Sequence, residues 1–415
     1  MFANAEENLH PYRRPSEYID YAINGCLFFY LIIDSITGFL LKTGAGPGIS
    51  APYKTFLLFL MVTSIIMKSS KLLISFSGAL FLAQVYLVLY CLDSNVALNQ
   101  SIATLIKTVT VVIYFIYFYC LLKVNSTYKN KLLNRFFKIN CTVFLSNIAL
   151  GILGFGFYTY PALKVGVKGF FYAGNEVSVL LFCLYYIFLT RLKFNNAKIL
   201  LVYAIGIGIS LLIITKTVVL SCILISCVDY YFRSTRKSYI ILFAPVILVI
   251  LISLGMHFLP QTQFYQKAES TIQFSINNRG YSLSDAVLSG RVGFLKNNYK
   301  VWEEHFSPAV FLFGLGHGTI MPRIVEIDVM DTFFYYGIII TVFKLLFYFY
   351  LVFQSIYIKN YHLFFFNLIY LFISFTAGHV WYGAMAGLFY AYINAYELRH
   401  YQVKKKKGLV YNGTK

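Results

Sequence analysis

The stretch VMDTFFYYGIIITVFKLLFYFYLVFQ, residues 329–354, decides the fold class because it carries only Asp331 and Lys344 as charged residues. A helix that crosses the hydrocarbon core of a bilayer needs about 20 predominantly apolar residues, and this stretch is longer. The whole chain of 415 residues has the same character, with 59% hydrophobic and 12% charged residues. A soluble chain with about half the usual charged share has too few charges to cover its surface. The sequence therefore predicts a polytopic membrane protein and excludes soluble enzymes, DNA-binding domains and disordered tails.

Hydropathy predicts an all-α fold of twelve transmembrane helices. The predicted spans are residues 18–41, 52–67, 72–92, 101–122, 138–156, 174–190, 197–214, 216–232, 238–258, 329–354, 361–377 and 379–397. They divide the chain into an N-terminal segment 1–17, nine spans within 18–258, a large extracytoplasmic loop 259–328, three spans within 329–397 and a basic tail 398–415. The long polar start favours an uncleaved first helix over a signal peptide.

The net charge of +19 follows the predicted membrane topology and gives no reason to expect a nucleic-acid surface. Most of the 35 lysines and arginines lie in segments that are cytoplasmic if the N-terminus is inside. The positive-inside rule therefore places both termini in the cytoplasm, and the lysines at 404–407 are expected to lie against anionic lipid. The seven cysteines lie in or beside apolar spans, which indicates packing and neither a disulfide framework nor a metal site.

The loop at 259–328 interrupts a series of short connections. Long ordered loops in compact proteins are usually functional. Within it, residues 283–306 mix apolar and charged positions at helical spacing, which predicts an amphipathic helix lying on the outer face.

Basic residues on the outer side stand out because the positive-inside bias does not require them there. They include Lys164, Lys168, Lys216, Arg279, Arg291 and Arg323. Guanidinium forks and ammonium groups that converge at one membrane face suit an anionic diphosphate. Arg291 in LSGR and Lys216 in ITKT are the strongest candidates, because small turn residues flank the first and two predicted helices flank the second. Unrelated surface charges or contacts with lipid phosphates are the alternative.

Three of the sixteen acidic residues, Glu326, Asp328 and Asp331, fall within six positions. Carboxylates at the mouth of an apolar helix are costly and are therefore functional candidates. Apolar walls raise the basicity of a carboxylate, which suits removal of a proton from a sugar hydroxyl. Glu326 and Asp328 are the candidate bases, whereas Asp331, on the same helix face as Asp328, is expected to be structural. The alternative is a salt network with the outer arginines, including an Arg323–Glu326 pair, without catalysis.

Four further residues are weaker candidates for contacts with substrate. Asn175 and Glu176 open the sixth predicted span, His317 lies in the turn GLGHG, and His379 lies at the outer end of the last helical hairpin. The turn lacks the spacing of a phosphate-binding glycine loop, so a turn that places His317 is favoured.

Several segments, taken in order, resemble the bacterial superfamily of O-antigen ligases and Wzy-type polysaccharide polymerases. LSGRVGFLKNNYKVWEEHFSPAVFLFGLGHG, residues 288–318, looks like the SGR…W…P…(F)GxG segment of that family's large outer loop. KGFFYAGNEVS, residues 168–178, is similar to the glycine-asparagine element that opens a middle span, and ITKT, residues 214–217, is similar to a short basic turn. The resemblance covers roughly residues 165–390 and depends on the order and spacing of these motifs.

The resemblance implies an inverting membrane glycosyltransferase that transfers a glycan from polyprenyl diphosphate to an acceptor hydroxyl at the outer face, with no cofactor or metal. The residues that take the diphosphate role are Arg291 and Lys216, with Arg279, Arg323 and Lys168 in weaker roles. Many ligase relatives carry a His-Asn pair followed by a glycine eleven residues on. Here Glu326 and Ile327 stand at that distance from Gly337, so a carboxylate takes the place of the histidine, or leaving-group stabilisation carries catalysis.

A polymerase of lipid-linked repeat units for a capsular, exo- or O-antigen-type polysaccharide is favoured over a glycan ligase. The chain is rich in Lys, Asn, Ile, Phe and Tyr, which suggests an A+T-rich genome, and a single-membrane bacterium has no lipid A core to accept glycan. The expected partners are the polyprenyl-diphosphate-linked oligosaccharide, membrane lipid, and flippase and chain-length regulator proteins, but no nucleic acid. The rival classes are a lipid-linked oligosaccharide flippase or other transporter, which more often shows two comparable halves, and a non-enzymatic envelope scaffold.

The charge asymmetry predicts which segments a membrane-impermeant reagent reaches. In intact cells, a thiol reagent of this kind should label Ser282→Cys in the outer loop and should leave Thr127→Cys at the level of the unsubstituted chain. The opposite pattern of labelling would overturn the predicted topology.

Overall fold

The computed structural model describes residues 15–46, 48–68, 98–122, 127–161, 164–191, 196–234, 291–316, 324–376, 378 and 380–406. The predicted spans at 72–92 and 238–258 lie outside these residues. So do Arg279, Arg323, His317 and His379.

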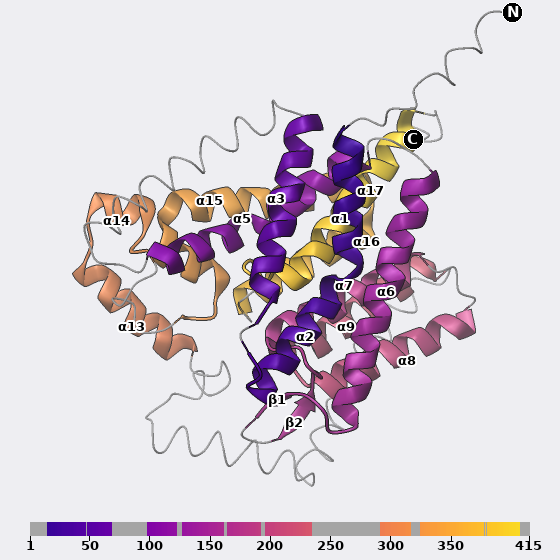
Figure 1. Ribbon diagram of the computed structural model, residues 1–415, viewed down its shortest axis with the longest axis horizontal. Helices are drawn as coiled ribbons and strands as arrows, with labels where there is room; N and C mark the ends of the chain where they lie inside the picture. Colours follow the sequence, from indigo (N-terminus) through magenta and orange to yellow (C-terminus); the bar gives the residue numbers. More distant parts are fainter. Residues whose placement is uncertain are drawn as a thin grey trace, which may run out of the picture.

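The described chain is helical apart from one short hairpin (Figure 1). The elements up to the long loop are α1 (Pro15–Phe28), α2 (Tyr30–Thr43), α3 (Ser50–Lys68), α5 (Leu98–Leu121), α6 (Thr127–Ile152), β1 (Tyr158–Tyr160), β2 (Val165–Val167), α7 (Gly174–Arg191), α8 (Asn196–Ile213) and α9 (Lys216–Arg233). Those that follow are α13 (Arg291–Glu304), α14 (Pro308–Phe313), α15 (Asp328–Tyr357), α16 (Tyr361–Thr376) and α17 (Ala384–Lys406). The predicted helical class is confirmed.

The number of membrane spans differs from the prediction. Among the described helices, α3 and α15 are long and apolar enough to cross a membrane, and the α1–α2 pair makes a third if it counts as one span. The apolar parts of α5, α8 and α16 are shorter, at Ile106–Leu121, Lys198–Ile213 and Tyr361–Thr376, and α6 and α17 carry several basic residues within their length. The described part of the chain therefore does not support twelve spans.

The β1–β2 hairpin was not predicted, because the segment between α6 and α7 was expected to be a loop. Its strands pair antiparallel, with Tyr158 opposite Val167 and Tyr160 opposite Val165. The Phe170 N–H that follows donates to Oδ1 of Asn147 on α6 over 3.1 Å. This contact holds the hairpin against the end of α6 and directs the chain into α7.

Helix α17 lies at the centre of the aromatic core and packs against α5 and α7. Tyr390 stacks on Tyr370 of α16 with ring centroids 3.6 Å apart, and Trp381, just before α17, stacks on Tyr348 of α15. Asn394 of α17 accepts a hydrogen bond from Asn367 of α16 over 2.8 Å. The core therefore joins the first and last parts of the chain around one buried helix.

The first predicted span is broken into α1 and α2, which meet at an angle of 46°. Asn140 of α6, which is fully buried, satisfies backbone groups on both sides of the break. Its Oδ1 accepts from the Leu31 N–H over 3.0 Å, and its Nδ2 donates to the Leu27 carbonyl over 3.0 Å. Backbone groups inside a membrane need protein partners, so this amide allows the helix to bend there.

Helix α15 is also bent, at Gly337, whose φ of 71° is unfavourable for other residues. The carbonyls of Phe334 and Tyr335 accept hydrogen bonds from the N–H groups of Leu315 and Gly316, over 2.8 and 3.0 Å. A Cβ on Gly337 would lie 2.3 Å from the Leu312 carbonyl oxygen. The segment after α14 therefore occupies the bend, and backbone hydrogen bonds hold Leu315 and Gly316 of the turn GLGHG there.

The described end of the predicted outer loop folds back onto α15. Helix α13 falls within the predicted helix at 283–306 and confirms helical structure over residues 291–304, whereas its place on the outer face stays a prediction. Trp302 of α13 is buried and lies against Phe333 of α15, with ring centroids 5.2 Å apart. This packing sets the position of Arg291, the first residue of α13.

Candidate functional site

Arg291 and Glu326 form an ion pair at the place where α13, α15 and α16 meet. Nη2 of Arg291 lies 3.3 Å from Oε2 of Glu326, and Nη1 donates to the carbonyl of Thr376 over 2.5 Å. Thr376 is the last residue of α16, where unpaired carbonyls and the helix dipole attract a cation. The two charged side chains are 15% and 32% exposed, so they remain within reach of a ligand.

Asp331 shapes the loop that carries Glu326. Its two carboxylate oxygens accept hydrogen bonds from the backbone N–H groups of Val325 and Glu326, over 2.8 and 3.0 Å. Glu326 has a φ of 65°, which is rare for a residue with a side chain. Gly378 approaches so closely that a Cβ there would lie 2.3 Å from the Glu326 carbonyl oxygen. These contacts agree with the structural role expected for Asp331.

Asp328 is fully buried at the first position of α15. Its Oδ2 accepts hydrogen bonds from the backbone N–H groups of Val380 and Trp381, over 2.9 and 3.0 Å. Lys344, farther along α15, lies with its ammonium 4.1 Å from the centre of the Tyr382 ring, and the positive charge attracts Asp328. The catalytic role of Asp328 stays a prediction, and its burial favours a structural one.

Lys168 is also held by the fold. The side chain is buried after β2, donates to the Tyr172 carbonyl over 2.5 Å and lies over the Phe157 ring. Burial lowers the pKa of this lysine below its ordinary value, because a low-dielectric environment disfavours the ammonium. Its geometry favours support of the loop over contact with a diphosphate.

The β1–β2 hairpin links the regions of Arg291 and Lys216. Burial raises the pKa of Tyr160 on β1, and the positive charge of Arg291 opposes that increase, so the two side chains lie within electrostatic range. On β2, a Cβ at Gly166 would lie 2.7 Å from the carbonyl of Ile213 at the end of α8. Lys216 is exposed at the start of α9, a few residues later. The structure thus places Lys216 near the hairpin.

A second group of charges lies deeper between the helices. Lys54 of α3 pairs with Asp34 of α2 over 2.8 Å, and both side chains are mostly buried. Glu176 of α7 interacts electrostatically with both of them and with the backbone of Ala384. The Tyr30 hydroxyl donates to the Ala384 carbonyl over 2.6 Å. Glu176 and Asp328 are therefore held by parts of one segment, residues 380–384.

Several residues of this arrangement were not predicted from the sequence. They are Lys54 and Tyr160, and also Thr376 and Gly378, which contact the loop that carries Glu326. Lys54 had a usable signal, because a lysine inside a predicted span is a functional candidate. Tyr160 and Thr376 had none, since their roles depend on chain segments distant in sequence.

No protein-family model matches this chain, and no curated protein matches it. The resemblance over residues 165–390 therefore stays a prediction. Within the described ranges, no three histidine, cysteine or acidic residues lie together in a way that could hold a metal ion.

Gly378→Ala should destabilise the loop that carries Glu326. The added methyl group meets the Glu326 carbonyl and forces alanine into a left-handed conformation, which alone costs about 1–2 kcal/mol. The thermal unfolding midpoint of the purified chain should fall. Gly208→Ala on α8 is the matched control, because nothing lies within 4 Å of the added Cβ. Equal midpoints for both variants would show that the close approach at Gly378 contributes nothing.

Proposed function

We propose that this chain is a multi-pass membrane glycosyltransferase of the polysaccharide polymerase type, with both termini in the cytoplasm. Its substrate is an oligosaccharide repeat unit on polyprenyl diphosphate, and its acceptor is a sugar hydroxyl of a second lipid-linked unit. The transfer takes place at the outer face, where the positive-inside rule puts Arg291 and Glu326.

The observation that supports this proposal is the partly exposed Arg291–Glu326 pair. A guanidinium and a carboxylate stand 3.3 Å apart at the entrance to α15, a helix long enough to cross a membrane. The guanidinium offers a planar fork for phosphate oxygens. The carboxylate next to it can accept a proton from a hydroxyl. A lipid carrier in the bilayer brings its diphosphate to such a position.

The proposed reaction uses these two groups as its catalytic side chains. The acceptor oxygen attacks the anomeric carbon and forms the new glycosidic bond, while the bond from that carbon to the diphosphate oxygen breaks. Glu326 takes the hydroxyl proton, and the bonding electrons remain on the diphosphate. Arg291 stabilises that charge, with exposed Lys216 as a further cation on the route of the substrate. Attack on the face opposite the diphosphate inverts the configuration.

There are two alternative functions: one is another glycosyltransferase, and the other is a transporter. A glycan ligase would use the same groups with a different acceptor. A flippase for lipid-linked oligosaccharide is favoured by a specific observation, the mostly buried Asp34–Lys54 pair beside Glu176, because charges inside a helical bundle often mark a transport path. The two classes differ in where lipid-linked units accumulate when the protein fails.

Glu326→Gln should reduce chain elongation by about 10²–10⁴-fold, because the amide keeps the shape of the side chain but loses its basicity. Glycan length on a gel, at matched protein levels, is the measurement, and single repeat units should accumulate on the outer face. Glu303→Gln, an exposed change on α13, is the control and should leave long chains. Long chains from Glu326→Gln would remove the carboxylate base. Accumulation on the inner face would favour the flippase.

Arg291→Ala should abolish elongation while the protein still inserts into the membrane. Arg291→Lys should restore little activity, because a point charge cannot reproduce the two-pronged contact with a phosphate. Lys300→Ala, an exposed loss of charge on the same helix, should leave glycan length unchanged. Full rescue by lysine would contradict recognition by the guanidinium fork.

A further inference from the structure

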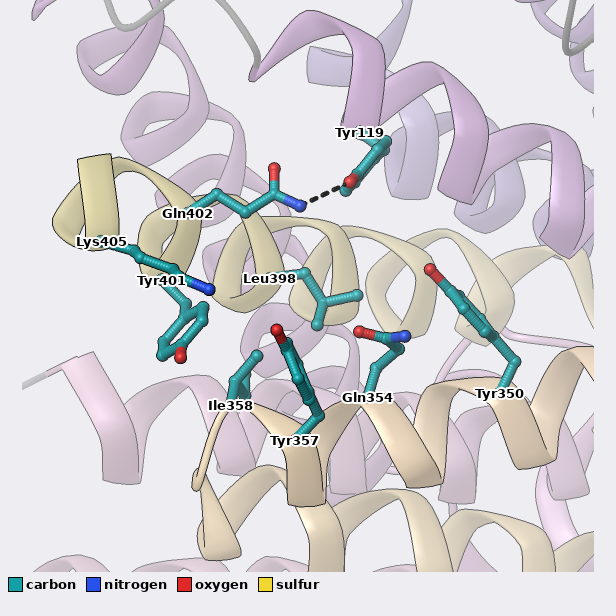
Figure 2. Close-up of a pocket in the computed structure, with 9 residues that line it drawn as sticks. All are labelled: Tyr119, Tyr350, Gln354, Tyr357, Ile358, Leu398, Tyr401, Gln402 and Lys405. Carbon is teal, nitrogen blue, oxygen red and sulfur yellow. Dashed lines mark hydrogen bonds between the residues drawn. The ribbon is translucent and has the colours of Figure 1, made fainter. Parts of the chain in front are cut away.

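A cavity of about 170 Å³ lies between α5, α15 and α17, at the end of α15 opposite Asp328 (Figure 2). The residues that line it are Tyr119, Tyr350, Gln354, Tyr357, Ile358, Leu398, Tyr401, Gln402 and Lys405. None of them is acidic. Its volume is below the roughly 300–1,000 Å³ of a site for a drug-sized ligand, so the cavity suits a small polar group.

One wall of the cavity carries the cation Lys405, and hydrogen bonds from Arg399 hold the neighbouring Tyr119 and Gln402 in place. Figure 2 shows the amide of Gln402 reaching Tyr119, whose hydroxyl it meets over 2.8 Å. Arg399 donates from Nε to the Tyr119 carbonyl over 2.7 Å and from Nη1 to Gln402 Oε1 over 2.6 Å. The guanidinium lies 3.4 Å from the centre of the Tyr119 ring. Lys405 extends from the last turns of α17 into the cavity (Figure 2).

Two residues that line the cavity also belong to an exposed, largely apolar face of α15. Leu346, Tyr350, Phe353 and Tyr357 follow one another at positions i, i+4, i+7 and i+11 of α15, which places them on one helix face. Leu346 and Phe353 are 63% and 64% exposed, and α15 is one of the helices able to cross a membrane. Tyr350 and Tyr357 belong both to this face and to the cavity. Tyrosines are typical of the boundary between hydrocarbon and water.

We propose that this cavity binds the phosphate headgroup of an anionic phospholipid. Lys405 and the tyrosine hydroxyls contact the phosphate, Gln354 bonds the rest of the headgroup, and the acyl chains lie along Leu346 and Phe353. The positive-inside rule assigns this end of the chain to the cytoplasm, where anionic lipids attract basic pockets between helices. The site is separate from the Arg291–Glu326 pair and does not depend on the proposed reaction.

The test measures lipid binding to the purified full-length chain in neutral detergent. Water-soluble dioctanoyl phosphatidylglycerol is titrated, with dioctanoyl phosphatidylcholine and inorganic phosphate as comparisons. Lys405→Gln should weaken binding of phosphatidylglycerol about tenfold, through loss of one charge-assisted hydrogen bond. Lys138→Gln is the matched control, because it removes the same charge from an exposed position on α6 that does not line the cavity, and it should weaken binding less than twofold.

A second variant tests the cavity without a change of charge. Gln354→Leu should weaken phosphatidylglycerol binding severalfold, because it makes the cavity floor apolar. Equal effects of the two lysine variants would indicate diffuse attraction and overturn the site. Equal affinity for phosphatidylcholine would overturn its preference for anionic lipid. Displacement of phosphatidylglycerol by inorganic phosphate at similar concentration would indicate a site for soluble phosphate compounds and overturn the lipid assignment.

Discussion

The need to satisfy backbone hydrogen-bonding groups where helices break governs the rest of this structure. A helix that ends or bends away from water leaves N–H and carbonyl groups that require partners from the protein. The break between α1 and α2 is satisfied by the Asn140 amide. The bend of α15 at Gly337 is satisfied by the backbone at Leu315 and Gly316. Each break thereby joins segments that are distant in sequence.

The candidate site follows from the same requirement. In the chain that leads into α15, the backbone N–H groups of Val325 and Glu326 donate hydrogen bonds to the Asp331 carboxylate. This turn sets the position of Glu326. In the chain that leads into α17, the backbone N–H groups of Val380 and Trp381 donate hydrogen bonds to Asp328. The last carbonyl of α16 receives Arg291. Three helix ends thus meet, and Glu326, unlike the two aspartates, has no backbone N–H bonded to its carboxylate among the described contacts.

Buried charge in this protein is not by itself a sign of function. Asp20 of α1 bonds Lys68 and Ser64 of α3. Asp229 of α9 bonds Arg233 on its own helix and Tyr203 of α8. These groups link neighbouring helices and satisfy one another, which is the usual requirement for charge in an apolar interior. The Arg291–Glu326 pair differs in its exposure and in its place at the meeting of three helix ends.

The sequence by itself determined the helical class, the approximate limits of most helices, and the selection of Arg291, Glu326 and Asp331. Runs of apolar residues and isolated charges are local signals, and they require no knowledge of neighbours. The described residues do not support twelve spans, because hydropathy treats bent helix pairs, short helices and helices with several charges as full spans. The β1–β2 hairpin was not predicted from the sequence, because it depends on a contact between distant segments. Asn147 of α6 accepts a hydrogen bond from the chain that follows the hairpin.

Only the tertiary structure decided which of the candidate residues meet. It paired Glu326 with Arg291, thirty-five positions earlier in the chain, and turned Asp328 toward the backbone at Val380 and Trp381. The sequence had treated Glu326 and Asp328 as equivalent bases. Their difference depends on burial and on partners from other helices, and such contacts are set by how the helices pack and are not encoded in local spacing.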